Sequence, residues 1–148
     1  VKYTDVASDN DGMQIFSYIG QFEFLNKYLI AGSYYEGGDY ISIDKTSGTE
    51  TNTFVDFPHV SPDKKNIICV KSNGYESTAD LELYEINGTK INHVMSASFK
   101  NWMTLAENNE MFWSTDGYLY LTVHNAKNFW KENVNYNDNY QYIRIKII

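Results

Sequence analysis

The sequence predicts an all-β protein built from antiparallel meander sheets. Aromatic residues make up 16% of the 148 residues, and Tyr, Phe and Trp favour pleated sheets over helices. Short alternating apolar and polar runs are separated by turn signals along the chain. A polar turn that leads into an apolar strand also recurs at a spacing of about 40 residues, at 24–32, 59–70 and 105–113. These observations predict a single domain, 1–148, with about ten strands.

The first repeat unit follows a polar N-terminal arm, 1–12, for which we expect a solvated conformation rather than a calcium site, because its aspartates lack the spacing of an EF-hand loop. Alternation then predicts strands at 13–19, 28–34, 40–44 and 49–54. The glycines in 36–39 and the polar run 45–48 predict the two turns between the last three of these strands.

The second and third units repeat this pattern, with hairpins predicted at Asn87-Gly88 and Asp116-Gly117. The predicted strands are 66–71, 80–86 and 90–96, then 102–105, 111–114, 118–123 and 140–148. The Asn-rich stretch 125–139 interrupts this pattern, and it predicts either a long loop or a short helix around 127–132.

Apolar positions on the alternating strands predict the core. The expected core residues are Leu29, Ile30, Ile41, Ile43, Ile67, Ile68, Val70, Leu81, Leu83, Phe112, Leu119 and Leu121. Cys69 is the only cysteine, and its place in an apolar run predicts a buried thiol.

The formal net charge is −7, which disfavours direct nucleic-acid binding because phosphate neutralisation requires a basic surface. A basic protein partner is the natural complement. No stretch has the length of an apolar membrane span, so no membrane partner is expected. The absence of disulfides predicts a cytoplasmic location, with a periplasmic one as the alternative.

No motif in the chain predicts catalysis, a cofactor or a metal site, and we expect the protein not to be an enzyme. His59, His93 and His124 lack a recognisable ligand spacing. No serine lies in a nucleophile elbow. Paired carboxylates such as Glu82 and Glu85 would serve a hydrolase only if both faced one cleft.

Aromatic and acidic residues instead cluster in the predicted turns, a combination that suits protein recognition because Tyr and Trp supply contact area while carboxylates bind basic side chains. The predicted partner-binding residues are Tyr34, Tyr35, Glu36, Asp39, Tyr75, Glu76, Asp80, Trp102 and Glu107. Two alternatives stay open: the rings merely flank strands, or they stack against sugar rings.

The segment 59–70, with His-Val-Ser-Pro-Asp-Lys-Lys before an apolar strand, followed by 80–90 with its Asn-Gly hairpin, resembles a blade of the WD40-like and TolB-like β-propellers. In those blades a Ser-Pro-Asp-Gly-Lys turn leads into the strand, so Lys64 stands where glycine is usual. The resemblance implies an incomplete, half-propeller-like architecture, because 148 residues are too few for a closed propeller.

A small acidic β domain without catalytic motifs is also similar to immunity proteins of bacterial contact-dependent growth inhibition systems. This similarity implies a protein that occludes the active site of a cognate toxin, a nuclease in the expected case, since such an enzyme carries a basic groove. The alternative is a periplasmic or cell-surface binding module for a glycan or an envelope protein. A hydrolase with paired carboxylates is a third hypothesis.

Overall fold

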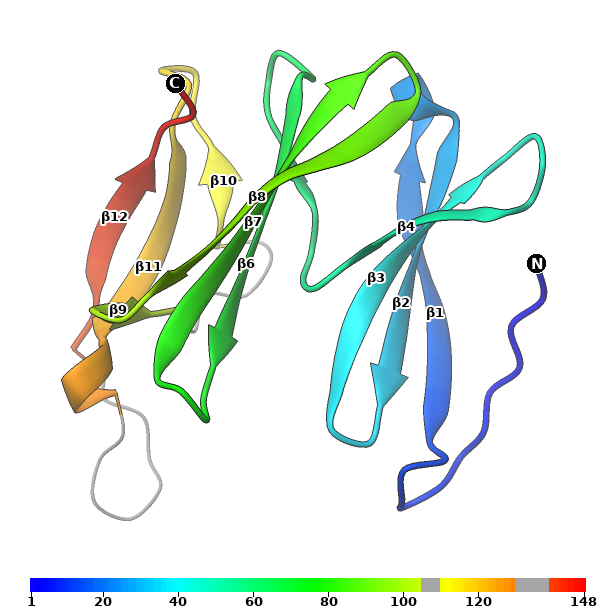
Figure 1. Ribbon diagram of the computed structural model, residues 1–148, viewed down its shortest axis with the longest axis horizontal. Coiled ribbons are helices and arrows are strands. Elements are labelled where there is room, and N and C mark those ends of the chain that lie inside the picture. Colours follow the sequence, from blue (N-terminus) through cyan, green and yellow to red (C-terminus); the bar gives the residue numbers. More distant parts are fainter. Residues whose placement is uncertain (105–109, 130–138) are drawn as a thin grey trace. The chain divides into compact units, whose positions relative to one another are not determined.

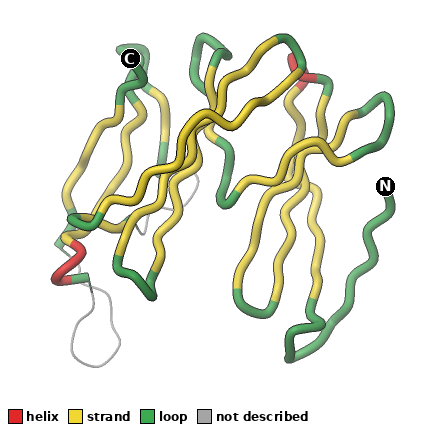
Figure 2. The backbone as a smooth tube through the Cα atoms, in the orientation of Figure 1, coloured by secondary structure: helices red, strands yellow, loops and turns green. Residues whose placement is uncertain are grey.

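The computed structural model describes residues 1–104, 110–129 and 139–148. The described chain is all-β, as predicted, and its strands form three open, antiparallel, four-stranded sheets (Figure 1). The described helical residues form only two short 3-10 turns, Glu23–Leu25 and Ala126–Asn128 (Figure 2). The arrangement of the sheets around a propeller axis stays a prediction.

The chain divides into two compact units. Unit 1 comprises Val1–Pro58 and Ile86–Asn92, and unit 2 comprises His59–Glu85 and His93–Ile148.

The first sheet lies in unit 1 and has the order β1-β2-β3-β4. Its strands are β1 (Gln14–Phe22), β2 (Lys27–Tyr34), β3 (Gly37–Asp44) and β4 (Glu50–Phe54). Alternation located all four strands to within a few residues.

The predicted turn at 36–39 is wrong by about two residues. Tyr34 pairs with Gly37, so the loop consists of Tyr35 and Glu36, and both glycines of this segment belong to β3. Gly38 is needed for close backbone approach, because a Cβ atom there would lie 2.8 Å from the carbonyl oxygen of Gly32.

The second sheet has the order β5-β6-β7-β8. Its strands are β5 (His59–Val60), β6 (Asn66–Asn73), β7 (Thr78–Asn87) and β8 (Lys90–Phe99). The predicted hairpin is confirmed, with Asn87 ending β7 and Gly88 adopting a positive φ of 62° in the turn.

The third sheet is centred on β11 (Leu119–Asn125), which pairs with β9 (Trp102–Met103), β10 (Phe112–Trp113) and β12 (Gln141–Ile145). The hairpin at Asp116-Gly117 is confirmed between β10 and β11. Of the predicted helix around 127–132, the structure describes only the end of the 3-10 turn 126–128 and its cap, because 130–138 lie outside the described residues.

The main core of unit 2 joins side chains of the second and third sheets with Met111, which precedes β10: Ile68, Val70, Ala79, Leu81, Met111, Leu119, Leu121 and Val123. Most predicted core positions are buried, as is Cys69. Phe112 is a wrong prediction, since 55% of it is exposed and its neighbour Met111 is buried instead. Ile30 and Leu83 are only partly buried.

The Ser-Pro-Asp-Lys-Lys turn between β5 and β6 is closed by local hydrogen bonds. The Asp63 carboxylate accepts the Ser61 hydroxyl at 2.6 Å and the Lys65 N–H at 3.1 Å, while Ser61 Oγ accepts the Asn66 N–H at 3.0 Å. Lys64 occupies the position where the blade resemblance leads one to expect glycine, and its φ is 59°. A side chain at positive φ is strained, so this lysine costs stability.

Replacing Lys64 with glycine is therefore expected to raise the free energy of unfolding by about 0.5 to 1 kcal/mol, because glycine accepts positive φ without a Cβ clash. Urea denaturation measures the change. Lys65→Gly is the matched control, since it removes the same charge at a position without positive φ, and it should lower stability through the entropy of the unfolded chain. Equal effects of both substitutions would contradict the strain at Lys64.

Candidate functional site

One face of the first sheet carries a row of aromatic side chains. The register places Phe16 opposite Gly32 and Tyr18 opposite Ile30, and alternation puts Tyr28 and Tyr34 on this same face. The ring centroids of Tyr18 and Tyr28 are 6.2 Å apart, and these residues are 62% and 40% exposed. We call this surface the aromatic face.

The N-terminal arm is attached to the aromatic face, although its residues other than Tyr3 and Ser8 are exposed, as expected for a solvated arm. The Tyr3 ring packs on Phe16 with centroids 4.5 Å apart, and the Tyr3 hydroxyl donates to Glu50 Oε1 at 2.7 Å. Asp5 accepts the Phe16 N–H at 2.9 Å. A β-bridge between Val6 and Gln14 continues the attachment.

Tyr3, Phe16, Tyr34, Asp39 and Glu50 form what we call the tyrosine–carboxylate cluster. The Tyr34 hydroxyl donates to Asp39 Oδ1 at 3.1 Å, and the Phe16 and Tyr34 rings meet edge to face at 6.3 Å. Desolvation, followed by the hydrogen bond to Glu50, raises the pKa of Tyr3; desolvation and the bond to Asp39 raise that of Tyr34. Both carboxylates act on both phenols, so the four polar groups are electrostatic neighbours.

Neither carboxylate of this cluster has a cationic partner among the described residues. The two ion pairs found there join Lys27 to Asp44 at 3.9 Å and Lys45 to Glu23 at 2.9 Å. The tyrosine hydroxyls occupy one oxygen of Asp39 and one of Glu50. Each carboxylate therefore keeps capacity to accept hydrogen bonds from a basic group.

Gly32 provides the space in which Tyr34 and Asp39 meet. A Cβ atom at this position would lie 2.5 Å from the Tyr34 hydroxyl oxygen and 2.6 Å from Asp39 Oδ1. Both contacts are with side-chain ends, so alanine would displace these ends rather than the backbone. The pair depends on this glycine.

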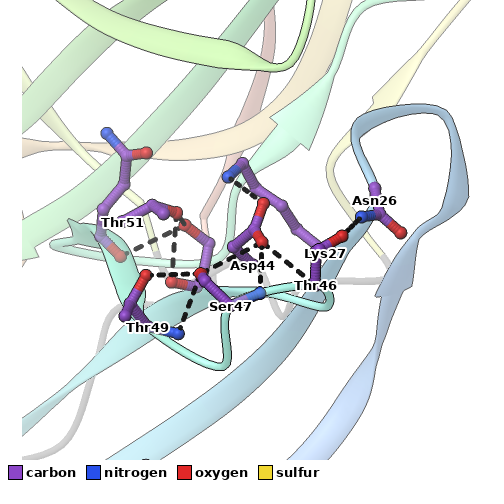
Figure 3. Close-up of polar contacts among 9 residues, drawn as sticks. Asn26, Lys27, Asp44, Thr46, Ser47, Thr49 and Thr51 are labelled. Carbon is purple, nitrogen blue, oxygen red and sulfur yellow. Dashed lines mark hydrogen bonds and ion pairs between the residues drawn. The ribbon is translucent and has the colours of Figure 1, made fainter.

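A network of short polar side chains fixes the β3–β4 turn beside Glu50 (Figure 3). Asp44 Oδ1 accepts the N–H groups of Thr46 and Ser47, at 3.0 and 2.9 Å. Its pKa is lowered, chiefly by the Ser47 N–H bond. Across the strands, Ser42 Oγ and Thr51 Oγ1 are 2.9 Å apart. We interpret the network as structural support that holds Glu50 near Tyr3.

The structure brings together only part of the predicted partner-binding set. Tyr34 and Asp39 are in contact, and Tyr35 and Glu36 form the exposed hairpin loop between their strands.

The other predicted partner-binding residues fall in unit 2. Tyr75 is 98% exposed, and the Asn73 side chain accepts its N–H and that of Glu76. Asp80 accepts the Thr78 hydroxyl at 3.0 Å. Trp102 stacks on Phe99 with centroids 5.0 Å apart, and Glu107 lies outside the described residues.

Tyr3, Phe16 and Glu50 are not among the site residues predicted from the sequence. The alternation of β1 could have placed Phe16 on a face shared with Tyr34. No local pattern connects Tyr3 with Glu50, which are 47 residues apart in the sequence.

The histidines and carboxylates do not form a metal site within the described residues, where no group of three His, Cys, Asp or Glu side chains could hold an ion. His59 is buried, His93 contacts Ser96 Oγ at 2.9 Å, and His124 Nδ1 lies 3.0 Å from the Asn139 carbonyl oxygen. The described residues also contain no helix that is long and apolar enough to cross a membrane.

No protein-family model matches the chain, and no curated protein or solved structure is significantly similar to it. The resemblance to propeller blades and to immunity proteins therefore stays a prediction.

Proposed function

We propose that this protein is a bacterial immunity protein that binds a basic surface of a cognate toxin, a nuclease in the expected case, through the tyrosine–carboxylate cluster. The observation that supports this proposal most directly is the presence of two carboxylates, Asp39 and Glu50, on an exposed aromatic surface without a cationic partner among the described residues. An arginine or lysine of the toxin would supply the missing cation.

The chemistry of the aromatic face suits such a cation. Lys45 Nζ already lies 5.0 Å from the centroid of the Tyr28 ring, and aromatic rings attract cations through their quadrupole. Tyr18 and Tyr28 add exposed contact area at low entropic cost. The face therefore combines rigid anchors with acceptors for a basic side chain.

The net charge of −7 supports the same partner through long-range attraction. An acidic protein accelerates encounter with a basic partner, and this acceleration weakens as salt screens the charges. Occlusion of the toxin by binding would require no reaction of the immunity protein itself.

The test is to co-express this chain with the protein encoded by the adjacent gene, and to measure association of the two purified proteins over a range of salt concentrations. We expect growth rescue and a complex. The double variant Asp39→Asn, Glu50→Gln should slow association about tenfold at low salt and reduce its salt dependence. The matched control, Asp9→Asn with Asp11→Asn, removes two charges from the exposed end of the arm and should have a smaller effect.

A third variant, Gly32→Ala, separates cluster geometry from charge. It leaves every carboxylate in place but displaces the Tyr34 and Asp39 side-chain ends, so we expect faster dissociation with little change in the salt dependence of association. Two outcomes would refute the proposal: a neighbouring protein that is not toxic, or full binding and rescue by both cluster variants. Either outcome would favour the cell-surface binding alternative.

A further inference from the structure

Unit 2 contains a pocket of about 460 Å³ that the proposed function does not use. The turn 61–66 forms one side, the β10–β11 hairpin another, and the C-terminal residues Ile147 and Ile148 a third. Small-molecule sites have volumes of roughly 300 to 1,000 Å³ and combine apolar walls with a few polar groups. This pocket fits that description.

The Trp113 ring forms the centre of the apolar wall and is held in a fixed orientation. Trp113 is half-buried against the unit 2 core, and its indole N–H donates to the His59 carbonyl oxygen at 3.3 Å. Pro62 and Ile147 complete the wall. An indole ring held in this way offers a rigid surface for the C–H face of a ligand ring.

The polar side of the pocket consists of hydrogen-bonding side chains, one of which is charged. The bonds from the Ser61 hydroxyl and the Lys65 N–H occupy Oδ1 of Asp63, which leaves its other oxygen as an acceptor. Asn66 and Thr115, which carry a carboxamide and a hydroxyl, also line the pocket. Together these groups can accept from and donate to neutral hydroxyls.

The charge pattern disfavours ionic ligands. Among the described residues that line the pocket, Asp63 alone has a charged side chain, and its carboxylate repels phosphates and other anions. Lys64 and Lys65 follow it in sequence, and Lys65 acts on the carboxylate electrostatically, which weakens its attraction for a free amine. A neutral ligand with many hydroxyls is not repelled by this carboxylate, and its binding does not require strong attraction between opposite charges.

We infer that this pocket is a saccharide-binding site in which Trp113 stacks against a sugar ring while Asp63 and Asn66 accept from its hydroxyls. This site is separate from the tyrosine–carboxylate cluster, and it does not depend on the proposed immunity function. It gives the Ser-Pro-Asp-Lys-Lys turn a binding role in addition to its structural one.

The test is titration of the isotope-labelled full chain with methyl glucoside, methyl galactoside and N-acetylglucosamine, followed by amide chemical shifts. At least one sugar should shift the amide signals of Ser61, Asn66, Thr115 and Gly117, with a dissociation constant of about 1 mM. Asp63→Asn should weaken binding about tenfold, since a hydrogen bond to a charged acceptor is lost. The matched control, Asp9→Asn, lies in unit 1 and should leave the affinity unchanged.

Trp113→Phe should weaken binding. Thr115→Val lies at an exposed turn and should also weaken binding, so it provides the test if the tryptophan variant fails to fold. The inference is overturned if none of the sugars shifts the pocket residues at about 100 mM, a hundredfold excess over the expected constant. Preferential binding of butylamine or inorganic phosphate at these residues would also overturn it, as would unchanged affinity in Asp63→Asn. Loss of toxin binding has no bearing on these measurements.

Discussion

Replacing Leu119 with alanine is expected to lower the free energy of unfolding by about 3 kcal/mol. Leu119 is completely buried and lies in the main core of unit 2, where β11 is the central strand of its sheet. The substitution removes apolar surface from the core and leaves a cavity that the surrounding strands can fill only in part. Urea denaturation followed by fluorescence measures the loss.

Phe112→Ala is the informative control for this prediction. The phenylalanine is larger than the leucine, yet it is 55% exposed and stacks only at the surface against Tyr120, with centroids 5.8 Å apart. Its removal should cost about 1 kcal/mol or less. A larger loss for Phe112→Ala than for Leu119→Ala would contradict the described packing of the third sheet.

Acidification from pH 6.5 to pH 4 is expected to destabilise the protein by about 3 kcal/mol through His59 alone. Burial lowers the pKa of this imidazole from 6.5 to about 4, because the folded protein disfavours its charged form. Between these two pH values the unfolded chain binds a proton at His59 that the folded chain does not bind. Stability is therefore complete above pH 6.5 and falls as the pH approaches 4.

Urea denaturation at several pH values within this window tests the prediction, with His59→Gln as the comparison. The variant should show a much shallower decline, whatever its stability at neutral pH. Asp44, Asp63 and Asp116 have lowered pKa values, so their contribution is lost mainly at more acidic pH. Parallel declines of the variant and the unchanged protein would show that another group controls the acid response.

The strands were predictable because their signals are local. Alternation of apolar and polar residues located β2 and β7 to within two residues at each end. The apolar run after the Ser-Pro-Asp-Lys-Lys turn located β6, in which residues 67–70 are all buried. The hairpins at Asn87-Gly88 and Asp116-Gly117 were located as well, because positive φ at Gly88 and Gly117 is a requirement of the turn itself.

The errors have non-local causes. Gly37 and Gly38 suggested a turn, but Gly38 serves close packing against the Gly32 carbonyl in the neighbouring strand. Met111 and Phe112 are adjacent apolar residues, and only the pairing of Phe112 with Tyr120 decides that the ring faces outward. A local sequence pattern predicts neither of these two contacts between strands.

Only part of the candidate site could be predicted, because some of its contacts join residues that are distant in the sequence. Tyr34 and Asp39 were both in the predicted partner-binding set because they lie in or beside one predicted turn, and the structure places them on the two strands of one hairpin. Tyr3 and Glu50 meet because the N-terminal arm lies against the sheet. The saccharide pocket likewise combines three segments that are distant in sequence.

The division of the chain into two units has a consequence for genetic dissection. The unit boundaries at 85/86 and 92/93 fall inside strands β7 and β8, and the intervening residues 86–92 belong to unit 1. Within that unit, the Ile91 carbonyl oxygen accepts a hydrogen bond from the Asn52 side chain at 3.1 Å, and Ile91 is buried. A fragment that ends at Pro58 would therefore lack a strand segment that its own fold uses. No single cut in the gene therefore yields both units intact.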